Sequence, residues 1–109
     1  MNFTRGEILW VDFRPTKGRE QDGRRPALVI SPQSYNDVSS TLLVCPITSN
    51  MNPWPWKVPL PEGDGIVGAI LVDQVKAIDP HARHAERAGQ SVPDAVMQEI
   101  TARLQTLIE

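Results

Sequence analysis

One short segment of the chain, TKGREQDGRRP at residues 16–26, is unusually dense in charged side chains. Arginine suits phosphate because its planar guanidinium offers several donors in a fixed geometry and stays charged at neutral pH. Proline holds the preceding residue in an extended backbone, so Arg25, directly before Pro26, projects from a fixed base. The segment therefore predicts either a solvated turn or a phosphate-binding site that includes Arg25.

Two hydroxyl side chains, Thr48 and Ser49, end the apolar segment TLLVCPIT at residues 41–48 and begin the turn that follows it. Such side chains commonly form turns by bonding nearby backbone groups. A hydroxyl here could also donate to a phosphate oxygen, although it is far too weak a base to accept a proton in catalysis. The residues alone leave both interpretations open.

Trp54 and Trp56 stand two positions apart in NPWPWK, residues 52–57, so an extended backbone puts both rings on one face. Tryptophan in a small domain usually belongs to the core. A pair flanked by prolines in a loop is also suited to stacking on unpaired bases.

Asp73 interrupts the apolar segment IVGAILVDQVKAI at residues 66–78. A carboxylate in a buried strand needs a partner, and Arg25 and Lys76 are the candidates.

The two histidines and the single cysteine are poor material for a metal site or a disulfide. His81 and His84 lie near Asp79 without a further ligand, which favours exposed turn residues. Cys45 is expected to be a small core residue.

These side chains require a mainly β framework. The expected strands are residues 7–13, 26–31, 41–48, 56–60 and 66–78. Most are apolar on both alternating faces, which favours a small closed or half-closed barrel, and their prolines predict a bent and bulged sheet. The segment SPQSYND at 31–37 is compatible with a helical turn.

The last segment, residues 91–109, has a different period. Its apolar side chains recur every three or four positions, at Val96, Met97, Ile100, Leu104, Leu107 and Ile108. This spacing predicts one amphipathic helix that begins near Pro93. Its apolar stripe must pack on the barrel or on a second subunit.

Length and charge limit the class of protein. The 109 residues predict a single domain, 1–109, and the net charge of −2 argues against a protein that coats nucleic acid by bulk positive charge. Residues 1–30 hold six bases and four acids, for +2, whereas the rest carries −4. A polyanion would therefore meet a local patch. The chain shows neither a signal peptide nor a membrane span, so we expect a cytoplasmic protein.

The order of segments closely resembles one family over nearly the whole chain. GEILWVDFRPTKGREQDGRRPALVISPQSYN, VCPITS, DQVKAID and the final RLQTLI resemble the MazF/PemK (Kid) toxin-antitoxin ribonucleases. The resemblance implies an SH3-like β-barrel with a C-terminal helix, the MazF/PemK/CcdB-like fold. It also implies a homodimer that cuts single-stranded RNA at short sequences without a metal or other cofactor, and that a cognate MazE-like antitoxin inhibits.

Site residues can be carried over by position. The family's catalytic pair falls on Arg25 and Thr48, Glu20 matches an acid important for RNA binding or activity, and Gln74 matches a position near the RNA groove. The other expected RNA contacts are Lys17, Arg19, Arg24, Ser49, Trp54 and Trp56.

Two differences from the Kid/PemK branch assign the chain to the MazF-like branch. The Kid/PemK branch has a histidine in place of Arg19 and an arginine in place of Leu71, and uses both with the aspartate that matches Asp73. Asp73 is therefore expected to be structural. The segment NPWPWKV stands where the family more often has a Tyr-Pro-Phe type sequence, which leaves the recognised bases open.

The implied reaction is attack of a ribose 2′-hydroxyl on its own 3′-phosphate, which gives a 2′,3′-cyclic phosphate and a 5′-hydroxyl end. Arg25 and the Thr48 hydroxyl would stabilise the developing charge, and Glu20 is the hypothetical general base. The alternative is a non-enzymatic toxin, because CcdB toxins share the fold and bind DNA gyrase. A plain SH3-like binding module is a third possibility. The Arg25 and Thr48 pair favours the nuclease.

Overall fold

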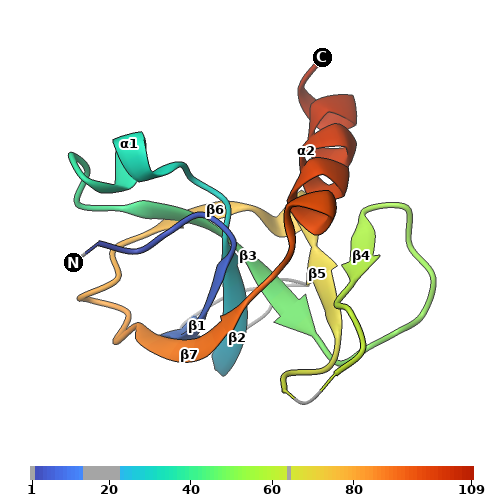
Figure 1. Cartoon of the computed structure of the whole chain (residues 1–109), viewed down its shortest axis with the longest axis horizontal. Helices are drawn as coiled ribbons and strands as arrows, with labels where there is room; N and C mark the ends of the chain where they lie inside the picture. Colours follow the sequence, from blue (N-terminus) through green and yellow to red (C-terminus); the bar gives the residue numbers. More distant parts are fainter. Residues whose placement is uncertain (1, 14–22, 64) are drawn as a thin grey trace.

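A bent antiparallel sheet and one long helix make up the chain in a computed structural model that describes residues 2–13, 23–63 and 65–109 (Figure 1). The strands are β1 (Glu7–Asp12), β2 (Arg24–Val29), β3 (Leu42–Thr48), β4 (Lys57–Pro59), β5 (Ala69–Leu71), β6 (Lys76–Ile78) and β7 (Glu86–Ser91). The helical elements are α1 (Gln33–Asn36), the 3-10 turn η1 (Val72–Gln74) and α2 (Asp94–Ile108). The mainly β fold with a C-terminal helix is thus confirmed, as is the helical turn after β2.

The strands follow the order β4-β5-β3-β2-β1-β7, and β6 pairs with β3 off this path. Over the described residues this path does not close on itself, so the barrel is half-closed. The expected bulge appears in β1, where the register with β7 shifts between Glu7 and Leu9.

The prediction of one strand at residues 66–78 is wrong in detail, because these residues form two strands, β5 and β6, separated by η1. The start of β3 pairs with β6, Val44 opposite Lys76, whereas its end pairs with β5, Thr48 opposite Ala69. A continuous apolar segment does not reveal such a break, because both halves are buried and equally apolar.

Strand β7 was not predicted from the sequence. Its residues, ERAGQS, include Gly89 and no large apolar side chain, so they show no strand pattern. The strand forms by backbone pairing with β1 at the edge of the sheet, and Ala88 packs against the core. Edge strands of this kind depend on a partner and have little sequence signal of their own.

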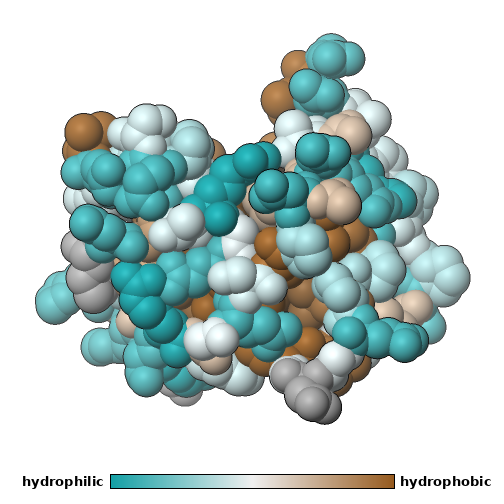
Figure 2. All heavy atoms as spheres, in the orientation of Figure 1, coloured by the Kyte–Doolittle hydropathy of each residue, from teal (hydrophilic) through white to brown (hydrophobic). Residues whose placement is uncertain are grey.

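Apolar side chains on alternate positions of the strands fill two cores. On β1, Ile8 belongs to a cluster with Met97 and Ile100 of α2, whereas Leu9 belongs to a second cluster with Phe3. The first half of α2 thus packs on the sheet. Figure 2 shows apolar surface exposed below the helix, between β7 and β4. None of the helices in the part of the chain that the structure describes has the length and apolar character needed to cross a bilayer.

Gly68 generates the first prediction. Its φ is +147°, and a Cβ built there would overlap the carbonyl oxygen of Thr48 across the β3–β5 pair. We expect Gly68→Ala to lower the free energy of unfolding by about 1–3 kcal/mol, measured by urea denaturation. Gly63→Ala is the control, because nothing lies within 4 Å of its added methyl group. Equal stability of the two variants would contradict this account of Gly68.

The buried thiol of Cys45 leads to the second prediction. Burial raises the pKa of its thiol from 9.0 to about 12, and the negative charge of Asp73 acts in the same direction. The native thiol should therefore resist iodoacetamide at pH 8, while the chain unfolded in urea reacts at an ordinary rate. The thiol of the unfolded chain ionises at a lower pH than the buried thiol of the folded chain. The contribution of Cys45 to the free energy of unfolding is therefore complete below pH 9.0 and is lost as the pH rises to about 12. Rapid alkylation of the folded protein would contradict the burial.

Candidate active site

Arg25 and Thr48 lie at the same end of two neighbouring strands. The recorded pairing of β2 with β3 places Ala27 opposite Pro46. Arg25 precedes Ala27 by two residues and Thr48 follows Pro46 by two, and the strands are antiparallel. Since side chains two apart share a face, both residues lie at the end of the face that carries Ala27. The fold thus places at the same end of two neighbouring strands two residues that are 23 positions apart in the sequence.

Thr48 is the last residue of β3 and keeps only 5% of its surface exposed. Its hydroxyl oxygen accepts a hydrogen bond from the backbone N–H of Asn50, at 3.1 Å, so the turn-forming role is real. An accepted hydrogen bond leaves the hydroxyl its own proton to donate. Turn formation and phosphate binding are therefore compatible at this residue.

A hollow of about 410 Å³ opens beside Thr48. Besides Thr48, the residues that line it are Asn50, Trp54, Lys57, Leu71, Asp73 and Gln74. Its volume falls in the range of ordinary ligand sites. Sequence reasoning had singled out Thr48, Trp54 and Gln74 but missed Asn50 and Lys57. The only signal for Lys57 was its place at the end of NPWPWK, a basic residue next to two aromatic ones.

Asp73 differs from its predicted environment. It is exposed, in η1 instead of a buried strand, so it does not need a cation to offset burial. Its Oδ2 accepts a hydrogen bond from the indole Nε1 of Trp54, at 3.0 Å. Lys76, one of its two candidate partners, stands over the ring of Phe13, 5.2 Å from the centroid. Asp73 instead joins η1 to the tryptophan loop.

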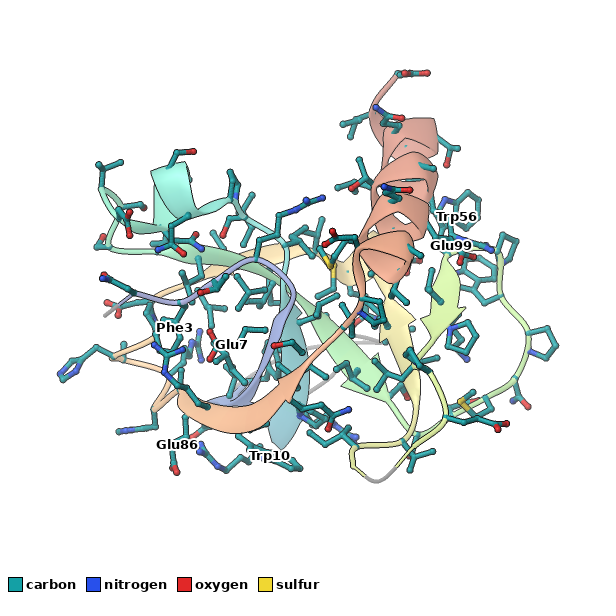
Figure 3. The ribbon with its side chains drawn as sticks, in the orientation of Figure 1. Phe3, Glu7, Trp10, Trp56, Glu86 and Glu99 are labelled. Carbon is teal, nitrogen blue, oxygen red and sulfur yellow. The ribbon has the colours of Figure 1, made fainter. Side chains whose placement is uncertain are left out.

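Trp54 and Trp56 lie side by side but in different surroundings. Their ring centroids are 5.4 Å apart and their planes are tilted by 60°. Trp56 is half-buried, packs against the core and donates its indole N–H to Thr106 of α2, at 2.9 Å. Figure 3 shows it on the side of the molecule where α2 stands. Trp54 keeps 48% of its surface exposed at the hollow.

Arg24 and Arg25 are neighbours on β2, so their side chains leave opposite faces. Arg24 forms an ion pair with Glu86 of β7, at 2.7 Å, and donates to the carbonyl of His84, at 3.1 Å. These contacts tie the sheet edge to the preceding turn. They also give Arg24 protein partners that compete with its predicted attraction for RNA.

The remaining predicted residues divide into two groups. Ser49 is exposed directly after β3, and Gln74 is half-buried at the hollow. Lys17, Arg19 and Glu20 lie outside the described residues.

His81 and His84 are exposed in the turn between β6 and β7, as expected. Within the described ranges, no three His, Cys, Asp or Glu side chains are grouped so that they could hold a metal ion.

Comparison with known proteins gives a consistent result. Residues 4–108 match the family model described as PemK-like, MazF-like toxin of type II toxin-antitoxin system. The chain is 43% identical over 103 residues to the endoribonuclease toxin MazF of Escherichia coli K12, which covers 94% of this chain and 91% of that protein. It is 45% identical over 113 residues to the endoribonuclease toxin ChpB of the same strain, with 98% and 95% covered.

Solved structures agree. A crystal structure of MazF from Deinococcus radiodurans superimposes with a TM-score of 0.91 at 37% identity, covering 99% of this chain and 97% of that one. A MazE-MazF complex from the same organism gives 0.86, also at 37% identity, with 99% and 96% covered. The chain belongs to the PemK-like, MazF-like family of toxins of type II toxin-antitoxin systems.

Proposed function

We propose that this chain is the toxin of a type II toxin-antitoxin module and acts as a metal-independent, sequence-specific endoribonuclease on single-stranded RNA. The observation that carries the proposal is the placement of Arg25 and Thr48 at the same end of the neighbouring strands β2 and β3, with Thr48 lining the hollow. The relatives that share most of the chain are named endoribonucleases, which supports the same reaction.

Arg25 and Thr48 supply the donors that this reaction needs. When the 2′-hydroxyl attacks its 3′-phosphate, negative charge grows on the two oxygens that do not bridge. A guanidinium and a hydroxyl held by neighbouring strands can stabilise this charge without reorganising during the reaction. Arg25 also protonates the leaving 5′-oxygen, so the products are a 2′,3′-cyclic phosphate and a 5′-hydroxyl end.

The general base is assigned to Glu20, which stands close in sequence to the arginines and outside the described residues. The other nearby carboxylate, Asp73, accepts the Trp54 indole N–H, and this contact supports a positioning role for it. Lys17 and Arg19 would add general attraction for the RNA backbone, which weakens with salt.

The proposed partners follow from the relatives and from the exposed apolar surface. A MazF relative is solved in complex with MazE, which supports a MazE-like antitoxin for this chain. An apolar hollow of about 580 Å³, lined by Leu60, Ile66, Val67 and Val96 among others, supports a homodimer. The molecule is proposed to be one domain that works in the cytoplasm.

A CcdB-like toxin that binds a protein target is the rival function. It shares the fold, so only the site separates the two. A protein-binding toxin has no use for a guanidinium and a hydroxyl at the same end of two neighbouring strands, which favours the nuclease.

The site assignment predicts that Arg25→Ala and Thr48→Ala each lower the cleavage rate by about a hundredfold to a thousandfold, because each removes one preorganised donor. The measurement is the single-turnover cleavage of a mixed single-stranded RNA in EDTA, with the ends mapped. Thr48→Ser is the matched control, because it keeps the hydroxyl. Wild-type rates in both alanine variants would refute the assignment, and RNA left intact by the wild-type protein would favour the rival.

The base assignment predicts that Glu20→Gln slows cleavage of saturating RNA, because an amide cannot accept the proton of the 2′-hydroxyl. The rate should be measured at saturating RNA, which separates chemistry from binding. A variant that binds weakly and yet cleaves at the normal rate when saturated would refute Glu20 as the base.

A further inference from the structure

The loop at residues 49–57 is held in place from two sides. Toward η1, the Trp54 indole N–H donates to Asp73 at 3.0 Å, and the Val72 N–H donates to the Trp56 carbonyl at 2.8 Å. Toward α2, the Trp56 indole N–H donates to Thr106 at 2.9 Å. The loop is therefore fixed to the framework before any ligand binds.

Trp54 nevertheless keeps about half of its surface exposed, 48%. It lines the hollow that contains Thr48 and also a second hollow of about 280 Å³, next to Arg103 of α2. Lys57 lines both hollows as well. A large aromatic ring that is fixed but uncovered can bind a flat partner without the entropy cost of ordering it.

We propose that Trp54 is a stacking platform for one unpaired nucleobase next to the cleaved phosphate, and that Asp73 is the positioning residue that orients its indole. The inference rests on the proposed nuclease function and deepens it. It assigns different roles to the two tryptophans, with Trp54 on the substrate and Trp56 in the framework.

An unpaired base is the occupant that fits the hollow. Its π faces match the indole, and its phosphate side would meet the Thr48 hydroxyl and the positive charge of Lys57. Stacking is tolerant of sequence, so Trp54 would strengthen binding at one nucleotide while side chains such as Asn50 and Gln74 read its edge.

The position of Asp73 supports its assignment as the residue that orients Trp54, because a negative charge at the hollow would otherwise only hinder RNA binding. A carboxylate at the hollow repels phosphate. The indole N–H of Trp54 can only donate, and the carboxylate accepts its hydrogen bond. The role of orienting Trp54 therefore explains why a negative charge is found at the hollow despite this repulsion.

The platform is tested by kinetics on a short RNA that carries the mapped cleavage site. We expect Trp54→Ala to raise KM about ten- to hundredfold and to leave kcat within about threefold, as the loss of one base–aromatic stack predicts. Trp54→Phe, which keeps a ring but loses the N–H, should lie between Trp54→Ala and the wild type. Trp10→Phe is the control, because Trp10 lies on β1 outside the hollow.

The positioning role is tested by comparing Asp73→Ala with Asp73→Asn. Both remove the charge, but only asparagine keeps an oxygen that accepts the indole N–H. Asp73→Asn should retain a KM at or below the wild-type value, and Asp73→Ala should approach the KM of Trp54→Ala. Single-stranded DNA of the same sequence, which lacks the 2′-hydroxyl, should quench the fluorescence of the wild type and of Trp10→Phe, and quench Trp54→Phe much less.

Three outcomes would overturn the inference. If Trp54→Ala cleaves with an unchanged KM while Arg25→Ala is inactive, the nuclease stands and the platform falls. If Trp54→Ala weakens only the binding of an antitoxin, the ring serves a protein partner. If the wild-type protein neither binds nor cuts RNA, the proposed function fails together with this inference.

Discussion

The burial of β3 is the constraint on which the rest of the molecule depends. Six of its seven residues are buried, and both of its edges are paired, with β2 on one side and with β5 and β6 along the other. Its side chains supply both cores, Cys45 and Ile47 to one and Leu42 and Val44 to the other. A strand enclosed in this way has little freedom to shift, because a slip of one residue would exchange its two faces.

The candidate site uses the end of this strand. Thr48 is held by pairing with Ala69, and Gly68 comes so close to its carbonyl that a side chain there would clash. The hydroxyl is therefore placed by the framework, while the neighbouring loop contributes the aromatic and basic groups. Catalytic donors gain most from such placement, since they need not reorganise as charge develops. The same buried strand thus supports the core and fixes the position of the Thr48 hydroxyl.

The basic residues show how the same side chain serves two purposes. Arg24 and Arg25 are adjacent, and strand alternation sends one to the sheet edge and the other toward the end of β3. Arg87 also has a structural role, because it pairs with the buried Glu7 and stacks over the ring of Phe3. Local positive charge in the sequence therefore does not by itself mark an RNA contact.

The local pattern of the sequence determined most elements and the candidate residues. Short apolar segments predicted β1 to β4, and the period of three to four predicted α2. The residue types in RRP and PITS were compatible with phosphate chemistry, which the family resemblance then favoured over simple turns. Only the tertiary structure decided the break at η1, the strand β7, the contact of Asp73 with Trp54, and the placement of Arg25 and Thr48 at the same end of neighbouring strands. These features depend on pairing between distant segments, which local spacing does not encode.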